Sequence, residues 1–350
     1  MSISLHSFLA DNKVEASAPC RIDSGGTWDI KAMALPLQRI GPVTINIALN
    51  LRTFVTLTPF KKGWVKVSSE GFPRSESFPV ETLPFNSSFG IFFGAVSYFG
   101  FHGLEINIRS QSPVRSALGG SSAALIATIK ALARVHSSFD GKNLSAEEIL
   151  HLAYHLEDGI NGGRCGLQDH AAAVYGGVNI WKWHYGYLAA PFSRKPLLDG
   201  KEQKKLSEHL LVAYSGKTHI SSKTNRKWID DFFSGQTRME WINVNEIVKN
   251  LASAIMAQQW ENAAAFLREE MVLRKKITPE ALIPVTSKLI EQAELAECGA
   301  RFTGAGAGGS LWAIGGKKNI QQLKKYWKSA LASVKNGKIL DCEVDPKGVE

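Results

Sequence analysis

The segment Pro113-Val-Arg-Ser-Ala-Leu-Gly-Gly-Ser-Ser-Ala-Ala-Leu125 is rich in glycine and serine and leads directly into an expected helix. The apolar residues that begin at Leu125 recur at helical spacing, so we expect the loop to end at a helix N-terminus. Small residues let a ligand approach the backbone, and the free N–H groups of a helix N-terminus attract phosphate. Since no Lys follows Gly120, this is not a Walker A loop, and a simple N-cap is the alternative interpretation.

On both sides of this loop, the apolar pattern predicts strands first and helices later. Alternating residues predict strands over 43–51, 104–108 and 178–183, and short apolar runs predict strands over 210–214 and 311–314. Helical spacing predicts helices over 145–157, most of 244–295 and 323–331. This order favours an α+β protein, with a boundary near residues 185–210, where Pro191, Pro196 and Gly200 interrupt the patterns.

The chain has 350 residues with 41 Lys+Arg and 32 Asp+Glu, a formal net charge of +9. Such a charge fits nucleic acid, an anionic membrane or an acidic small molecule, but no nucleic-acid motif is present. The uncharged stretch Thr82–Leu104 has its phenylalanines on one helical face, which favours a core helix over a membrane span. The four cysteines lack metal-binding spacing, so we expect inert thiols in a reducing cytoplasm.

Two further glycine clusters flank the central loop. In 18–29, a strand delivers Arg21 to a Gly-Gly turn that presents Thr27 and Asp29; alone, this is typical of a turn with a surface salt bridge. In 301–309, the glycines match GxGxxG, but a strand follows them and no acidic residue lies about 20 positions on. We therefore exclude a dinucleotide site and expect a backbone loop that closes over a substrate or a phosphate.

Two carboxylates lie on either side of a glycine-rich turn in 157–170. Glu157 ends a predicted helix, and the turn leads to Asp169 and His170. A lone Asp beside Gln and His is usually structural, and the alternative is that two acids separated by a glycine-rich turn supply one metal ligand and one base. A structural role is the favoured interpretation of His170, because a single histidine is weak evidence for a general base.

In this order the motifs APxR…GGxxD, the Gly/Ser loop, GxQD and TGAGxGG resemble the galactokinase–homoserine kinase–mevalonate kinase–phosphomevalonate kinase (GHMP) superfamily over nearly the whole chain. APCRIDSGGTWD and GLQDHAAAVYGG are most similar to the fucokinase and D-glycero-D-manno-heptose 7-phosphate 1-kinase branch. The resemblance implies a domain like ribosomal protein S5 domain 2 over residues 1–195 and a ferredoxin-like domain over residues 196–350. Arg115 and Ala117 stand where the branch usually has Gly, and His170 stands where it usually has Gln.

The resemblance also implies a role for each matching residue. Asp169 matches the catalytic carboxylate that deprotonates or orients the acceptor hydroxyl. Arg21 matches the arginine that pairs with this carboxylate and holds it ionised. Glu157 matches a Mg²⁺ ligand that acts with a loop serine: aligning on Leu118-Gly119 selects Ser121, and aligning on residues 123–125 selects Ser122. The matching ATP- and phosphate-binding loop is Arg115, Ser116, Ala117, Leu118, Gly119, Gly120, Ser121 and Ser122. The matching substrate-binding residues are Gly26, Thr27, Asp29, Gly176, Gly304 and Gly306.

The implied function is a cytoplasmic kinase of carbohydrate metabolism, which uses ATP and Mg²⁺ to phosphorylate a sugar or sugar phosphate at the anomeric C1 hydroxyl. Phosphoryl transfer needs mainly positioning and charge neutralisation, which an amide cradle, Mg²⁺ and one carboxylate provide. A non-catalytic sugar or nucleotide sensor is the alternative on the same fold, and a serine hydrolase built on 119–123 is a second. We expect neither nucleic-acid nor membrane partners; monomer and homodimer both stay open.

Overall fold

The computed structural model describes residues 5–139, 141–187, 191–218 and 221–350, which form two β-sheets with helices packed against them. Within these residues the first sheet has seven strands. Six follow the order β4 (Glu76–Pro79), β3 (Trp64–Ser69), β5 (Leu104–Ser110), β2 (Val43–Pro59), β6 (Val178–Trp183) and β7 (Phe192–Pro196), and β1 (Val14–Ser24) pairs with β2. The second sheet has the order β11 (Gly337–Leu340), β8 (Leu210–Ser215), β10 (Ser310–Ile314) and β9 (Gly299–Phe302).

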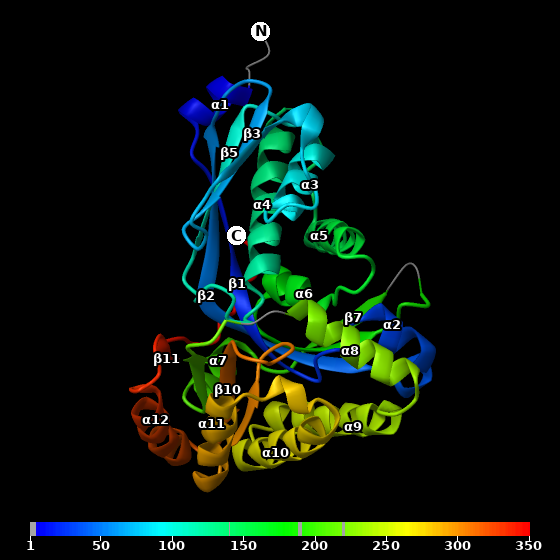
Figure 1. Cartoon of the computed structure of the whole chain (residues 1–350), viewed down its shortest axis with the longest axis vertical. Helices are drawn as coiled ribbons and strands as arrows, with labels where there is room; N and C mark the ends of the chain where they lie inside the picture. Colours follow the sequence, from blue (N-terminus) through cyan, green and yellow to red (C-terminus); the bar gives the residue numbers. More distant parts are fainter. Residues whose placement is uncertain (1–4, 140, 188–190, 219–220) are drawn as a thin grey trace.

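The long strand β2 is the spine of the first sheet. One of its edges pairs with β1, while the other pairs with β5 over Thr53–Pro59 and with β6 over Val43–Ile47. The register with β1 shifts between Pro19 and Cys20, at a proline that has no N–H for the ladder. Beyond this bulge, β1 carries its last residues down to the second sheet, as Figure 1 shows.

Helices of the first half cover one face of the first sheet in Figure 1. They are α3 (Gly90–Phe99), α4 (Gly120–Ser138), α5 (Ala146–Ile160) and α6 (Gln168–Tyr175); the peripheral elements are α1 (Leu5–Asp11), α2 (Lys31–Ala34), η1 (Leu35–Ile40) and η2 (Val80–Thr82). The apolar face of α4 is buried as its spacing predicts. At the start of α5, Ser145 and Glu148 form the reciprocal capping box expected from their spacing.

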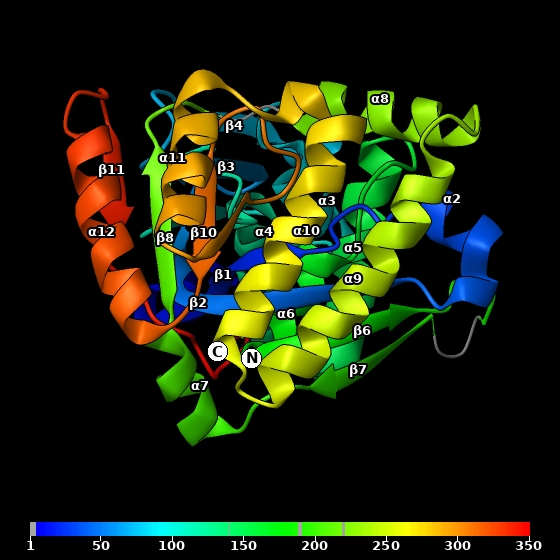
Figure 2. The same cartoon turned by 90° about the horizontal axis from the view of Figure 1, so that it is seen from below.

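Helices of the second half lie against the smaller sheet and below the first one, as Figure 2 shows from below. They are α7 (Gly200–Ser207), α8 (Ser221–Phe233), α9 (Arg238–Met256), α10 (Trp260–Ile277), η3 (Pro279–Ala281), α11 (Pro284–Leu295) and α12 (Lys317–Leu331). The predicted α+β class is confirmed, whereas the division at residue 195 stays a prediction. Among the described residues, no helix combines the length and apolar character needed to cross a bilayer, and Thr82–Leu104 contains the short helix α3.

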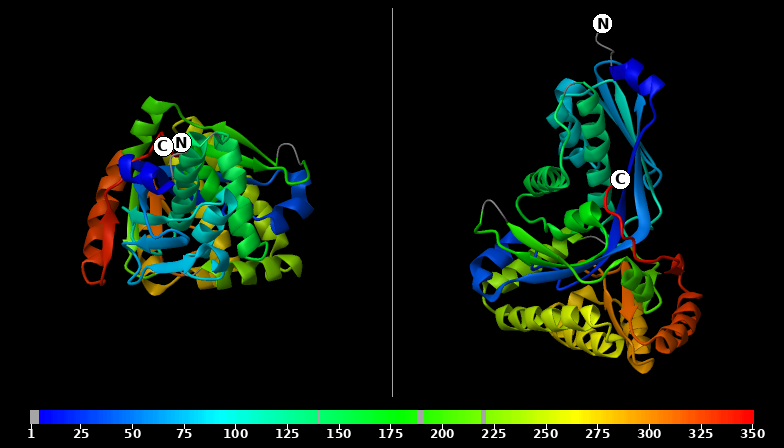
Figure 3. Two further views of the ribbon diagram at one scale, coloured as in Figure 1. Left: turned by 90° about the horizontal axis from the view of Figure 1, so that it is seen from above. Right: turned by 180° about the vertical axis from the view of Figure 1, so that it is seen from behind.

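After β11 the chain returns to the first sheet, which Figure 3 shows from behind as the segment that leads to the C-terminus. Val344 bridges Leu49, and the backbone N–H of Asp345 donates to the carbonyl of Ala48. The carboxylate of Asp345 lies 2.6 Å from Nη1 of Arg52, and both side chains are nearly buried. The C-terminal residues therefore tie the end of the chain to the spine of the first sheet.

We expect Asp345→Asn to lower the free energy of unfolding by about 2 kcal/mol, because it leaves the Arg52 charge buried without its main partner. Glu350→Gln is the control, because Glu350 is exposed and lies 3.6 Å from Arg52; we expect it to change stability by less than about 0.5 kcal/mol. Urea denaturation of both variants measures the difference. Equal stabilities would show that the tie depends on the backbone bonds alone.

Candidate active site

A cleft of about 940 Å³ opens where β1, the N-terminus of α4, the turn between α5 and α6, and α8 meet. Most of the residues singled out in the sequence line it. They are Arg21, Gly26, Thr27, Asp29, Arg115, Ser116, Ala117, Gly119, Gly120, Ser121, Ser122, Glu157, Asp169 and Gly304. The fold thus brings all three glycine clusters and both carboxylates of the 157–170 segment into one cavity.

Three of the predicted residues lie behind the cleft wall rather than on it. Leu118 is buried, and its carbonyl accepts a hydrogen bond from the backbone N–H of Arg21. Gly176 ends α6 at φ +62°, and a Cβ there would lie 2.3 Å from the carbonyl carbon of Lys347. Gly306 has φ +68°, and its Cβ would lie 2.6 Å from the carbonyl oxygen of Ala281. These two glycines allow backbone segments to pack closely.

Asp169 and Arg21 form the ion pair at the centre of the cleft. Nε and Nη2 of Arg21 lie 2.8 and 2.7 Å from Oδ1 of Asp169, and Nη1 donates to the carbonyl of Ala117. Arg21 is 4% exposed, so this pair is not the surface salt bridge that the motif alone suggests. Although burial opposes its charge, the carboxylates of Asp169 and Asp23 raise the pKa of Arg21 above its usual value. The second oxygen of Asp169, Oδ2, lies beside Gly119, 3.4 Å from where a Cβ would stand.

The glycine- and serine-rich loop after Pro113 ends at the N-terminus of α4. Gly119 is its N-cap at φ +73°, and the following N–H groups belong to the first helical turn, where no intrahelical acceptor is available. Arg115 and Ala117 have φ values of +53° and +62°, which is uncommon for residues other than glycine. The chain therefore takes, without glycine, a backbone course that glycine adopts more easily.

Ser122 and Glu157 face each other across the helices α4 and α5. The hydroxyl of Ser122 donates to Oε2 of Glu157 at 3.0 Å, whereas Ser121 is exposed and has no such contact with Glu157. Burial raises the pKa of Glu157, but the charge of His170 and the Ser122 hydroxyl outweigh it and lower the pKa below its usual value. An ionised carboxylate beside a hydroxyl is a ligand set that suits Mg²⁺.

His170 stands on the other side of Glu157. Its ring is fully buried, and Nε2 lies 2.6 Å from Oε2 of Glu157. Burial alone lowers the pKa of His170, but the Glu157 carboxylate raises it above the usual value. His170 is not among the residues that line the cleft, and a structural role stays the favoured interpretation.

Asp29 is a second buried carboxylate in the cleft. Its oxygens accept hydrogen bonds from the backbone N–H groups of Thr27 and Gln168, each at 3.1 Å. Burial, together with the charge of Asp169, raises the pKa of Asp29 to about 7. Gly166 must be glycine here, because its Cβ would lie 1.9 Å from Oδ2 of Asp29. Thr27 has φ +93°, and its buried hydroxyl lacks a hydrogen-bond partner among the described residues.

Sequence reasoning missed the buried charges behind the cleft. Glu270 and Arg274 lie four residues apart on α10, a spacing typical of an exposed helical ion pair, yet both are fully buried. The guanidinium carbon of Arg274 lies 4.5 Å from the ring centroids of both Trp228 and Trp241. Burial lowers the pKa of Arg274 to about 9. No local pattern distinguishes these residues from solvent-facing ones.

The amino-acid sequence is similar to those of known kinases. Residues 90–177 match the GHMP kinases N terminal domain. A mevalonate kinase of Thermococcus onnurineus is 26% identical over 330 residues, which cover 88% of this chain and 91% of the relative.

Two solved structures share the fold. The galactokinase of Lactococcus lactis complexed with galactose superposes with a TM-score of 0.74 at 17% identity, covering 97% of this chain and 95% of the other. A D-glycero-D-manno-heptose 1-phosphate kinase from Bacteriodes thetaiotaomicron gives 0.68 at 16% identity, covering 96% and 97%. The matches do not single out the fucokinase and heptose kinase branch. The chain therefore contains a segment that matches the GHMP kinases N terminal domain, and it has the GHMP kinase fold.

Proposed function

We propose that this chain is an ATP- and Mg²⁺-dependent kinase that phosphorylates a hydroxyl group of a sugar or sugar phosphate, at the anomeric carbon. One observation carries the proposal. A single cavity holds the Arg21–Asp169 pair, the N-terminus of α4 and the Ser122–Glu157 pair. These are an acceptor-side carboxylate, a cradle of N–H groups and a set of oxygen ligands, which together meet the needs of phosphoryl transfer.

In this proposal the role of each residue follows from its position in the cleft. Arg21 holds Oδ1 of Asp169, which leaves Oδ2 to orient the acceptor hydroxyl or accept its proton beside Gly119. The N–H groups at the start of α4 hold the phosphates of ATP, helped by the helix dipole. Glu157 and Ser122 are the residues that would hold Mg²⁺, which neutralises phosphate charge when bound.

The acceptor end of the cleft supports a polyhydroxylated substrate. Asp29 and the unpartnered hydroxyl of Thr27 offer hydrogen bonds to substrate hydroxyls. Arg164 and Arg226 also line the cleft, and both side chains are exposed, so a phosphate on the acceptor would find cationic partners there. The anomeric hydroxyl is the most acidic one on a reducing sugar, which suits an Asp already engaged by an arginine.

A mevalonate-type acceptor is the second candidate. The relative from Thermococcus onnurineus, matched over 88% of this chain, is a mevalonate kinase, and a carboxylate would find the same arginines as a phosphate. Asp29 favours the sugar, because a second buried acid beside Asp169 binds hydroxyls better than it binds an anion. A cytoplasmic location stays a prediction.

ADP release measured with galactose, fucose, mannose, heptose 7-phosphate, homoserine and mevalonate tests the function. We expect turnover with a sugar or sugar phosphate, and Asp169→Asn to lower kcat by about 10²–10⁴-fold in a protein that stays folded, because Asp23 still pairs with Arg21. Asp11→Asn, an exposed change in α1, is the control and should keep full activity. Turnover with mevalonate alone would overturn the sugar assignment, and nucleotide binding without turnover on any acceptor would favour the sensor.

We expect the two loop serines to differ in how strongly their substitution changes the Mg²⁺ requirement of the enzyme. We expect Ser122→Ala to raise the Mg²⁺ concentration for half-maximal activity by about tenfold or more, because the hydroxyl facing Glu157 is lost. Ser121→Ala removes the same group from an exposed position in the same loop, so it should leave that concentration nearly unchanged. The opposite ranking would assign the metal contact to Ser121.

Asp29 should make the stability of the protein depend on pH. Its pKa of about 7 when folded exceeds the usual value near 4, so the stabilisation from its bound proton is full below pH 4 and is lost between pH 4 and 7. Asp29→Asn removes this loss. We therefore expect its stability relative to the wild type to rise between pH 5 and 7, by at most about 1.4 kcal/mol per pH unit.

Urea denaturation at several pH values measures this difference, with Asp11→Asn as the exposed control. Parallel stability curves for Asp29→Asn and the wild type would show that Asp29 titrates alike in both states.

A further inference from the structure

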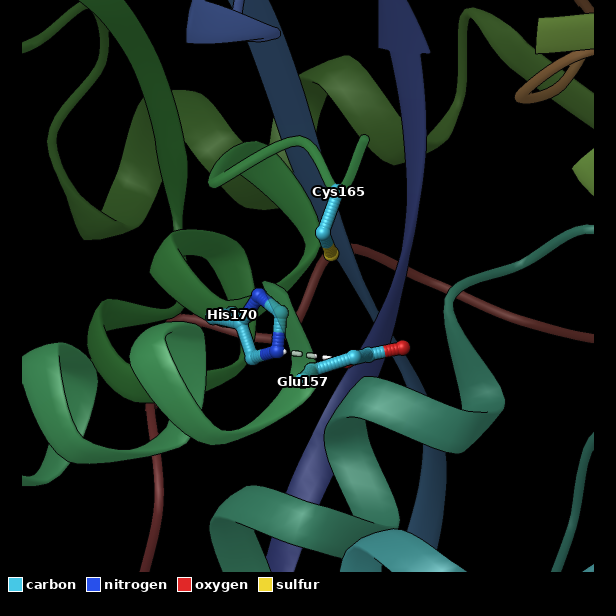
Figure 4. Close-up of side chains that lie close together, drawn as sticks. All are labelled: Glu157, Cys165 and His170. Carbon is cyan, nitrogen blue, oxygen red and sulfur yellow. Dashed lines mark ion pairs between the residues drawn. The ribbon is translucent and has the colours of Figure 1, made fainter. Parts of the chain in front are cut away.

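Three side chains with different ligand atoms converge at the inner wall of the cleft. Figure 4 shows the thiol of Cys165 and the ring of His170 directed toward the carboxylate of Glu157. One ligand atom from each residue lies within 4.8 Å of the other two. Residues from the end of α5, the following turn and the start of α6 build this cluster. The spacing of the cysteines predicts inert thiols, but the fold places Cys165 close to two other side chains that can bind a metal ion.

The ring nitrogens of His170 are the strongest sign that this cluster can bind a cation. Its ring is fully buried, and neither of its nitrogens has a hydrogen-bond partner among the described residues. Nε2 lies 2.6 Å from Oε2 of Glu157 as an ion pair, whereas Nδ1 makes no such contact among the described residues. A buried polar group without a partner is costly, and a shared cation would satisfy both residues.

We propose that Glu157, Cys165 and His170 form a site for a borderline divalent cation, of the class of Zn²⁺ or Co²⁺. Sulfur, nitrogen and carboxylate oxygen are the ligands of such ions, whereas Mg²⁺ selects oxygen alone. Three protein ligands leave a fourth position for water. Binding converts the Cys165 thiol to a thiolate and requires a neutral His170 ring, so the thiol proton and any proton on His170 go to solvent, with no change in oxidation state.

This site overlaps the proposed Mg²⁺ site, and that part of the inference rests on the proposed function. Oε2 of Glu157 is the atom that contacts both the hydroxyl of Ser122, at 3.0 Å, and Nε2 of His170, at 2.6 Å. An ion held between Cys165 and His170 therefore takes the oxygen that Mg²⁺ needs. A borderline metal acts here as an inhibitor that competes with Mg²⁺.

Cobalt binding to the nucleotide-free protein without Mg²⁺ tests the site directly. We expect one Co²⁺ per chain by equilibrium dialysis, together with a near-ultraviolet thiolate-to-cobalt charge-transfer band. Cys165→Ser should abolish the band and weaken binding by about tenfold or more, because it removes the sulfur ligand. Cys342→Ser is the matched control, since Cys342 is also partly buried and lies outside the cluster, and it should change neither readout.

His170→Gln supplies a second, independent variant, because it removes the imidazole and keeps a polar side chain. We expect weaker Co²⁺ binding with the charge-transfer band retained at saturating metal, and circular dichroism checks that each variant is folded. Absence of Co²⁺ binding to the wild type would overturn the site. Equal affinity of Cys165→Ser and the wild type would overturn it as well.

Inhibition assays separate this inference from the proposed function. With an active kinase, Zn²⁺ should inhibit the wild type and raise its Mg²⁺ requirement, and Cys165→Ser should be markedly less sensitive at unchanged basal activity. Cobalt binding in a protein without kinase activity would support the metal site and contradict the function. Kinase activity without cobalt binding would support the function and contradict the metal site.

Discussion

A buried chain of alternating charges joins the two sheets, and the site depends on it. Asp23, near the end of β1, lies 3.3 Å from Arg21 and 3.4 Å from Arg301 of β9. Arg301 in turn lies 3.1 Å from Glu270 of α10, whose other oxygen accepts a hydrogen bond from Ser24 at 2.5 Å. All of these ion-pair side chains are at most 4% exposed. The first sheet, the second sheet and α10 therefore meet through charges that water does not screen.

Such a network is costly unless each charge has its partners, so it holds its members in one arrangement. Asp23 also accepts a hydrogen bond from the backbone N–H of Gly304, which places the closing glycine loop against β1. Because Arg21 takes part in this network and in the pair with Asp169, the position of Asp169 follows from the junction between the sheets. The chemistry of the cleft is thus oriented by residues that do not line it.

Local patterns predicted the elements that carry a clear period or cap, such as β6, the capping box of α5 and the helix after the glycine loop. They also predicted the cleft residues that lie in glycine-rich motifs. What they missed depends on tertiary burial. Glu270 and Arg274 have the spacing of an exposed pair, and only the packing of α10 against the junction makes them buried. Likewise, the choice between Ser121 and Ser122 needs the position of Glu157 across two helices.

In the loop before α4, an alanine takes a conformation that usually needs glycine, and a glycine just before β10 leaves room for its side chain. Ala117 stands at φ +62°, a conformation that glycine adopts most easily, and its methyl group needs space. Gly309 provides that space, because a Cβ on it would lie 2.7 Å from the Cβ of Ala117. The N–H of Ser310 then donates to the carbonyl of Ser116, and Arg21 donates to that of Ala117. Contacts from both sheets thus hold a backbone course that glycine would otherwise have to permit, which restricts this loop more than a glycine-rich sequence would.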